Sequence, residues 1–227
     1  MRDLDGVTIV FDLDGTLVDT APDLLRVLDE VLRREGAPVP PYEEARLMIG
    51  HGARVMIERA AARVGLAWSE EKLTSLTADF VEIYAADIAR ESRPFPGLEA
   101  ALDALKAAGA RLSVCTNKRT GLSELLLAAL GLAHRFDAIV GADVVTAKKP
   151  AADHYVAAVT RAGGDVGRSV MVGDSAADVG AARAAGAPVI AVTFGYCEEG
   201  VDALGADALI SSYDELGAVA RRLVFSR

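Results

Sequence analysis

Short apolar segments alternate with amphipathic ones along most of this 227-residue chain, and this alternation most constrains its fold. The apolar segments are short and rich in Val, Ile and Ala, as expected of buried strands. Most of the segments that separate them have apolar residues at helical spacing, and several end in Gly. Such repetition predicts a parallel sheet with helices on both faces. The expected strands are 7–11, 111–115, 138–140, 169–173, 188–193 and 208–210, and the expected helices are 97–109, 121–131, 151–163, 175–186 and 212–223.

The stretch after the first expected strand breaks this rhythm. From Ala21 to Arg93 no strand is expected, and apolar residues recur at helical spacing instead. We therefore predict an α/β fold, with a Rossmann-like doubly wound parallel sheet core formed by residues 1–20 and 94–227 and a helical domain, 21–93, inserted after the first strand. The helical stretches of the insert are 21–36, 43–50, 52–65 and 69–92.

Composition and charge exclude several classes of protein. The chain is 52% hydrophobic and 25% charged, and no apolar run approaches the roughly 20 residues of a membrane span. The formal net charge of −9 opposes binding to nucleic acid. The N-terminus does not resemble a secretory signal, and neither Cys115 nor Cys197 has a CxxC partner. We expect a cytoplasmic protein, monomeric or homodimeric, that binds neither nucleic acid nor membrane.

Polar residues follow several of the expected strands. Ligands of a doubly wound sheet bind beyond the carboxyl ends of its strands, so these residues should converge at one edge. They are Asp12 and Asp14 after the first strand, Thr116, Asn117 and Lys118 after the second, Lys148 and Lys149 in the connection TAKKP, and Asp174, Ser175 and Asp178 after the fourth.

Asp12 and Asp14 carry the strongest chemical signal. Two carboxylates at the end of a buried strand lose hydration and repel each other, so ordinary packing does not explain them. A bound divalent cation such as Mg2+ would explain them, because it prefers oxygen ligands and keeps positions open for water and phosphate. Asp-x-Asp-Gly is also typical of a plain strand-to-turn junction, and the pair alone does not decide between the two interpretations.

Four motifs together resemble one family. DLDGT at 12–16, TN at 116–117, KKP at 148–150 and GDSAAD at 173–178 occur in the order typical of the haloacid dehalogenase-like superfamily of phosphohydrolases, around a helical insert. Each motif alone is weak evidence, whereas the four in order cover nearly the whole chain. The resemblance implies an Mg2+-dependent phosphomonoester hydrolase that forms an aspartyl-phosphate.

The resemblance also assigns catalytic roles. Asp12 would be the nucleophile that attacks phosphorus, and Asp14 the acid that protonates the leaving oxygen and then the base that activates water. Thr116 would hydrogen-bond the phosphoryl group, helped by backbone N–H groups around Asn117. Gly15 and Thr16 of the DLDGT motif are further predicted substrate contacts.

The same resemblance indicates a lysine and a metal site. Lys149, which directly precedes Pro150, would neutralise phosphate and nucleophile charge, with Lys148 as the competing candidate. For Asp178 the alternative is an ordinary first-turn acid in a helix that Ser175 caps. The predicted Mg2+ site comprises Asp12, the backbone carbonyl of Asp14, Asp174, and Asp178, which would hold metal-bound waters.

The helical insert would be a cap that closes over the site and selects the substrate. The segments 48–60, 94–97 and 116–132 look like those of the phosphoglycolate phosphatase family, which implies 2-phosphoglycolate as a small anionic substrate. The substrate contacts predicted in the insert are Gly50, His51, Gly52 and Arg54, whose N–H groups suit a carboxylate. Relatives often have Asn where this chain has His51, and an exposed turn histidine is the alternative for that position.

Other activities stay open from the sequence. A phosphatase for a sugar phosphate or pyrophosphate is the nearest rival. A sugar phosphomutase is less favoured because 21–36 contains no histidine, and a phosphonate hydrolase would need a cap lysine, for which Lys72 is the sole candidate. A non-catalytic phosphate-binding protein on the same fold is a further alternative. His134 and His154 are expected at the surface.

Overall fold

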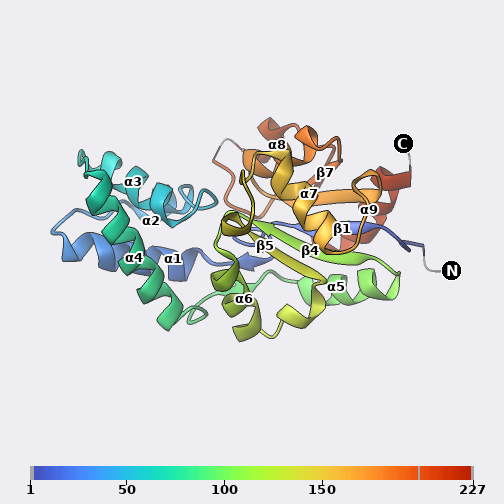
Figure 1. The fold of residues 1–227 in the computed structure, drawn as a ribbon, viewed down its shortest axis with the longest axis horizontal. Helices are drawn as coiled ribbons and strands as arrows, with labels where there is room; N and C mark the ends of the chain where they lie inside the picture. Colours follow the sequence, from blue (N-terminus) through green and yellow to red (C-terminus); the bar gives the residue numbers. More distant parts are fainter. Residues whose placement is uncertain (1–2, 199, 226–227) are drawn as a thin grey trace.

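The computed structural model describes residues 3–198 and 200–225, and six parallel strands form the centre of its larger lobe (Figure 1). Their order in the sheet is β5-β4-β1-β6-β7-β8. All six strands predicted from the sequence are present, and the predicted α/β class is confirmed. The strands are β1 (Thr8–Phe11), β4 (Arg111–Thr116), β5 (Ala138–Gly141), β6 (Ser169–Gly173), β7 (Val189–Val192) and β8 (Ala208–Ile210).

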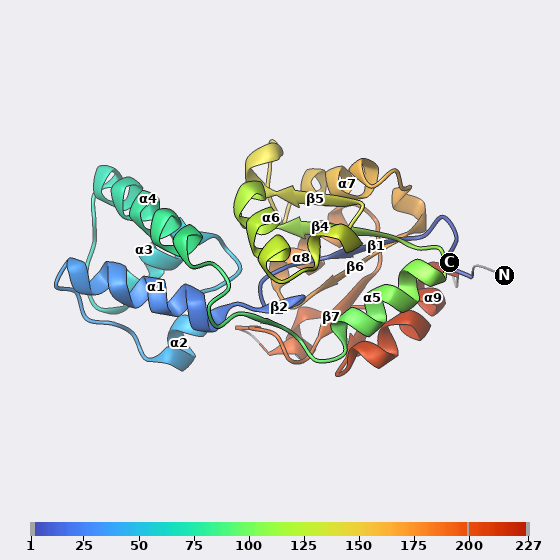
Figure 2. The same cartoon turned by 90° about the horizontal axis from the view of Figure 1, so that it is seen from below.

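Helices cover both faces of this sheet, as predicted (Figure 2). The buried side chains of β1 alternate between two apolar clusters: Ile9 and Phe11 belong to one, and Val10 to the other. Since β1 is buried on both faces, its sequence is a continuous apolar run. One face packs against α5 (Leu98–Ala107), α6 (Thr120–Ala129) and α9 (Leu216–Phe225), and the other against α7 (Ala152–Arg161) and α8 (Ala176–Ala184).

The strand order places a topological switch at β1. From β1 the chain moves outward through β4 and β5, and it then returns to β6 on the other side of β1 before continuing to β7 and β8. The connections diverge there, so a crevice forms beyond the carboxyl ends of the central strands. Asp12 follows β1 directly and therefore lies at this crevice.

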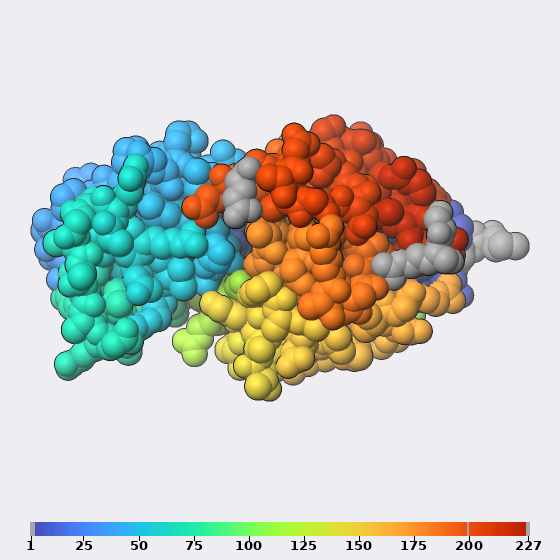
Figure 3. Space-filling model, turned by 90° about the horizontal axis from the view of Figure 1, so that it is seen from above, coloured from blue at the N-terminus to red at the C-terminus, as the bar shows by residue number. Residues whose placement is uncertain are grey.

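The four helices of the insert lie beside the sheet core as a separate lobe, coloured blue to cyan (Figures 1 and 3). A two-stranded antiparallel ribbon joins this lobe to the core, with Val18 paired to Pro94 and Asp19 to Arg93. The expectation of no strand up to Arg93 is wrong at that residue, because a two-residue strand is too short to leave a pattern. The elements are α1 (Ala21–Arg34), α2 (Tyr42–Arg46), α3 (Ala53–Arg63), α4 (Glu70–Ala86), β2 (Val18–Asp19) and β3 (Arg93–Pro94).

Helix α4 ends at Ala86, whereas the sequence pattern extends to residue 92. A distant carboxylate explains the difference. The buried side chain of Asp23 accepts hydrogen bonds from the backbone N–H groups of Glu91 and Ser92, at 2.9 and 2.8 Å, and from the Ser92 hydroxyl at 2.7 Å. These bonds fix residues 91–92 outside the helix.

None of the helices within the described residues combines the length and apolar character needed to cross a bilayer.

Candidate active site

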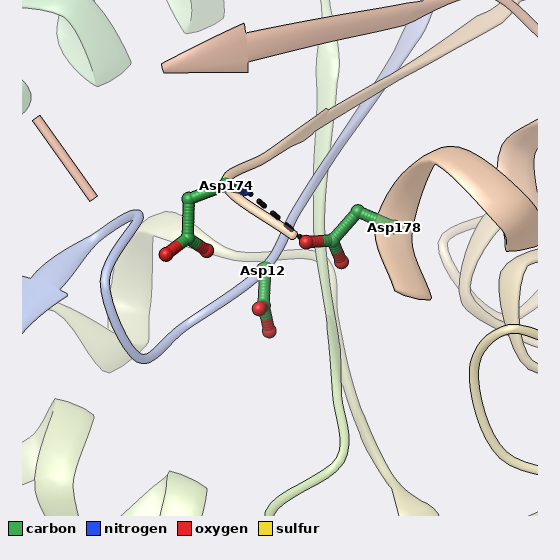
Figure 4. Close-up of side chains that lie close together, drawn as sticks. All are labelled: Asp12, Asp174 and Asp178. Atoms are coloured by element: carbon green, nitrogen blue, oxygen red, sulfur yellow. Dashed lines mark hydrogen bonds between the residues drawn. The ribbon is translucent and has the colours of Figure 1, made fainter. Parts of the chain in front are cut away.

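Three buried carboxylates meet at the crevice beyond β1 and β6 (Figure 4). Asp12 follows β1, Asp174 follows the neighbouring strand β6, and Asp178 lies in the first turn of α8. One oxygen atom from each lies within 4.8 Å of the others. Segments more than 150 residues apart in the sequence thus supply one cluster of oxygen donors.

Asp178 links this cluster to the start of α8. Its Oδ2 accepts hydrogen bonds from the backbone N–H groups of Asp174 and Ser175, at 3.2 and 3.0 Å, and from the Ser175 hydroxyl at 2.6 Å. Asp178 and Ser175 form a capping box, which satisfies N–H groups at the helix start. The two interpretations of Asp178 are therefore compatible: it caps α8 through Oδ2 and also belongs to the acid cluster.

Lys149 lies between two of the acids. Its Nζ is 2.8 Å from Asp12 Oδ1 and 2.6 Å from Asp178 Oδ1, and its side chain is 1% exposed. Burial disfavours the ammonium, but the two carboxylates outweigh this and raise the pKa of Lys149 above its ordinary value. Lys148 is exposed and its Nζ donates to the backbone carbonyl of His51 at 2.9 Å. Of the two lysines, Lys149 contacts Asp12.

The expectation that His154 lies at the surface is wrong. Its side chain is fully buried and holds the backbone that carries Lys149. The Lys149 N–H donates to His154 Nδ1 at 3.1 Å, so Nε2 carries the proton and donates to the Val140 carbonyl at 3.0 Å. Burial lowers the pKa of His154 to about 4, which keeps the ring neutral at pH 7. The apolar stripe of α7 gave a signal for this position, since Ala158 lies one turn away and is also buried.

The charge balance of the cluster favours a bound cation. Burial and the neighbouring Asp178 raise the pKa of Asp12 well above its ordinary value, and the same two causes raise that of Asp174 to about 7. One ammonium, that of Lys149, faces three carboxylates here. A divalent ion would supply the missing positive charge, and an all-oxygen donor set suits Mg2+. The residues present thus fit a divalent cation, with Asp12, Asp174 and Asp178 as the side chains that would hold it.

We expect the metal-free protein to lose thermal stability as the pH rises from about 4 to above 7. The folded-state pKa of Asp174, about 7, exceeds its ordinary value of 3.8, so the folded chain holds this proton more tightly than the unfolded chain does. The resulting stability is present below pH 4 and is lost as the pH passes 7. In EDTA, we expect Tm to fall by about 5 °C between pH 5 and pH 8 on this account, and Mg2+ to restore it at pH 8.

Other carboxyl groups titrate in the same range, so Asp174→Asn is the control for this prediction. In that variant, we expect the Asp174 contribution to the pH-dependent fall in Tm to disappear. Most of the increase in Tm on adding Mg2+ should disappear as well. A metal-free wild type whose Tm follows the same pH curve as Asp174→Asn would contradict the assignment.

Asp14 lies at the same crevice but has different partners. Its Oδ1 accepts from the Thr20 hydroxyl and from Lys118 Nζ, both at 2.7 Å, and Oδ2 accepts from the same Nζ at 3.0 Å. Burial disfavours the ammonium, but Asp14 outweighs it and raises the pKa of Lys118 to about 12. The sequence analysis assigned no role to Lys118, although its position two residues after β4 was a signal.

The other predicted phosphate contacts lie around these acids. Thr116 ends β4 and is buried, and its hydroxyl accepts the Lys118 N–H at 3.1 Å. The Thr16 hydroxyl donates to Asp174 Oδ1 at 3.0 Å. Gly15 has a φ of 83°, and a Cβ there would collide with the Asp174 carboxylate. Gly15 and Thr16 thus support Asp174 in this structure.

Asn117 connects the core to the insert. Its Nδ2 donates to the carbonyl of Gly50 at 3.1 Å and to that of Lys149 at 3.3 Å. Gly50 belongs to the Gly-His-Gly segment of the insert, which the sequence predicted near the site. The structure therefore brings this segment to the loop that carries the buried lysine.

A cavity of about 720 Å3 lies between the sheet edge and the insert. Both Asp12 and Asp14 line it from the core. From the insert, the half-buried side chain of His51 also lines the cavity. Burial, and to a smaller extent the nearby charge of Arg59, lowers the pKa of its ring below the ordinary value of 6.5, so the ring is neutral at pH 7. The Arg54 guanidinium also lines the cavity but pairs with Glu70 at 2.6 Å. The other predicted substrate residues that line it are Gly50, Gly52, Thr116 and Asn117.

Known proteins match both the sequence and the fold. The chain is 51% identical to a phosphoglycolate phosphatase of Caulobacter vibrioides over 94% of its length and 90% of that protein. It is 44% identical to a phosphoglycolate phosphatase of Agrobacterium fabrum, over 91% of this chain and 89% of that one. A crystal structure of a predicted phosphoglycolate phosphatase from Haemophilus somnus has a TM-score of 0.88 and 28% identity, covering 95% of this chain and 98% of that one.

These relatives indicate a phosphatase, as the sequence predicted. The sequence profile of the haloacid dehalogenase-like hydrolases matches residues 9–192, which include all four motifs. This chain therefore belongs to the haloacid dehalogenase-like hydrolase family.

Proposed function

We propose that this phosphatase hydrolyses 2-phosphoglycolate to glycolate and phosphate, with Mg2+ as cofactor and an aspartyl-phosphate, the acyl phosphate of Asp12, as intermediate. The observation that carries the chemistry is the position of Asp12: at the switch point of the sheet, in contact with Lys149 and clustered with two further acids. The substrate assignment is supported by relatives that are named phosphoglycolate phosphatase and cover most of this chain.

Each residue at the site has a separate role in the proposed reaction. A carboxylate oxygen of Asp12 attacks phosphorus, the ester P–O bond breaks, and the leaving glycolate oxygen takes a proton from Asp14. Water then attacks the phosphoryl group, Asp14 takes its proton, and Asp12 is released with phosphate. Lys149 and the N–H groups after β4 offset charge on the phosphoryl oxygens. Mg2+, when bound by the acid cluster, screens the repulsion between the nucleophile and the phosphate.

We further propose that residues 21–93 act as a cap over this site. The Asn117–Gly50 and Lys148–His51 hydrogen bonds hold the insert against the core, with the cavity enclosed between them. A closed cap excludes water until the ester is bound and strengthens the electrostatic contacts inside. The cytoplasmic location and the monomeric or homodimeric state stay predictions from the sequence.

We expect 2-phosphoglycolate to be the preferred ester in a panel that includes sugar phosphates, nucleotides and pyrophosphate, assayed with Mg2+. A site built around a carboxylate rejects analogues that lack it, and we expect a difference in kcat/KM of at least about 100-fold. Release of inorganic phosphate is the measurement. Equal turnover across the panel would overturn the substrate assignment and leave the phosphatase assignment in place. A preference for pyrophosphate or a sugar phosphate would replace 2-phosphoglycolate as the assigned substrate.

A further inference from the structure

A buried hydroxyl of the insert has no hydrogen-bond acceptor. Tyr84, in α4, is 0% exposed, and its Oη donates to no described residue, because the ammonium of Lys118 beside it can only donate. Burying a hydroxyl without a partner is costly, and such groups are rare in folded proteins. Tyr84 also lines the cavity that contains Asp12 and Asp14. A hydroxyl in this state is prepared to donate to a ligand bound in that cavity.

A buried ammonium of the core lies against the same tyrosine. Lys118 Nζ lies 4.8 Å from the centre of the Tyr84 ring, and its side chain is 6% exposed. An ammonium has three N–H donors, and the Asp14 carboxylate accepts two hydrogen bonds from this one. Lys118 lines the cavity as well. A donor from the insert and a cation from the core therefore meet beside Asp14.

Other cationic groups around the cavity are engaged elsewhere. Arg54 pairs with Glu70 and also donates to the Thr74 hydroxyl at 3.2 Å. The ammonium of Lys148 donates to the backbone of the insert, and that of Lys149 lies between two carboxylates. Arg119 lines the cavity but is exposed to solvent, where a contact with an anion is weaker. This leaves the pair of Lys118 and Tyr84 as the buried donors best suited to an anionic group.

We propose that Lys118 Nζ and Tyr84 Oη bind the carboxylate of the substrate and so select phosphate esters whose leaving alcohol carries a carboxylate. This inference rests on the proposed function and extends it to residues outside the Gly-His-Gly segment. In 2-phosphoglycolate, a single CH2 group separates the carboxylate from the ester oxygen. An ammonium that contacts both this carboxylate and Asp14 brings the ester oxygen close to the acid that protonates it.

Tyr84→Phe tests the proposal with a matched pair of esters, 2-phosphoglycolate and 2-hydroxyethyl phosphate, in which CH2OH replaces the carboxylate. We expect kcat/KM for 2-phosphoglycolate to fall about 10-fold or more, because the variant loses a hydrogen bond to a charged group. For 2-hydroxyethyl phosphate we expect a change of less than about 3-fold. Since the hydroxyl donates to no described residue in the free protein, we expect Tm to change by less than about 2 °C. Tyr42→Phe, an exposed tyrosine of α2, is the control and should affect neither ester.

A binding measurement separates recognition from turnover. In calorimetry with Mg2+, we expect Tyr84→Phe to weaken binding of 3-phosphonopropionate, a stable analogue of 2-phosphoglycolate, by about 10-fold and to leave that of ethylphosphonate unchanged. Lys118→Met should lower kcat/KM for both esters, because Asp14 loses its partner, and should reduce it further for 2-phosphoglycolate. Arg119→Met should change both esters equally.

The outcomes distinguish this inference from the proposed function. If the wild type prefers 2-phosphoglycolate over 2-hydroxyethyl phosphate and Tyr84→Phe keeps the full preference, the carboxylate site is wrong and the proposed function stands. Loss of the preference in Arg119→Met instead would also overturn the site. A wild type with no preference between the two esters would overturn both proposals.

Discussion

Asp12→Asn is expected to reduce kcat by at least about 10^4-fold without unfolding the protein. An amide is a poor nucleophile toward phosphorus, and the other two carboxylates of the cluster are held elsewhere. Asp178 accepts from the N–H groups at the start of α8, and Asp174 accepts from the Thr16 hydroxyl and the Tyr196 N–H. The substitution also removes one negative charge from a buried group of three. We therefore expect an unchanged or higher Tm in metal-free buffer, measured alongside phosphate release.

The intermediate gives this prediction a second readout. With phosphorus-labelled substrate and rapid acid quench, the wild type should retain label on the chain, and hydroxylamine should release it as expected of an acyl phosphate. Asp12→Asn should retain none. Asp202→Asn, an exposed acid in the short helix Val201–Leu204, is the matched control and should behave as the wild type. Substantial turnover or labelling in Asp12→Asn would exclude Asp12 as the nucleophile.

Lys149→Met is expected to lower both activity and stability, whereas Lys148→Met should lower neither by much. Removing the Lys149 ammonium leaves the buried Asp12 and Asp178 carboxylates without their partner, and breaking such a pair costs about 3–5 kcal/mol. For a chain of this length, that corresponds to a fall in Tm of about 10 °C. We expect kcat to fall by about 10^3-fold, because phosphate loses its buried counter-charge.

Lys148 provides a matched control for the Lys149→Met variant. Lys148 differs from Lys149 by one position and shares its charge, but its ammonium is exposed and contacts only the backbone of His51 among the described residues. We expect Lys148→Met to change kcat by less than about 3-fold and Tm by less than about 2 °C. A larger loss of activity in Lys148→Met than in Lys149→Met would reverse the assignment that the KKP motif suggested.

Local pattern was sufficient to predict the core of the fold. Each strand of the sheet contains a short apolar stretch, such as IVF in β1, and most flanking helices carry a stripe at helical spacing, so strand and helix positions follow from nearby residues. The exceptions depend on distant partners. The pairing of Val18 with Pro94 and the early end of α4, which Asp23 causes, join positions more than 60 residues apart. Sequence periodicity contains no information on such contacts.

The same distinction applies to the site. Residues with a fixed place in a motif, such as Asp12 and Asp174, were predicted because strand ends converge in any doubly wound sheet. His154 and Tyr84 were missed because their importance lies in a contact: one with the backbone of Lys149, the other with the ammonium of Lys118. A helical stripe predicts that such residues are buried, and it does not identify what they touch.

The two hydrogen bonds of Asn117 have a mechanical consequence. One amide nitrogen joins the Gly50 carbonyl of the insert to the Lys149 carbonyl of the core. Any motion that swings the insert away from the sheet must break the first bond and free the amide to turn, which loosens its hold on the second. The TAKKP loop that carries Lys149 is thus held most firmly when the two lobes are in contact. If the insert acts as the proposed cap, we expect product release and loosening of this loop to occur in one movement.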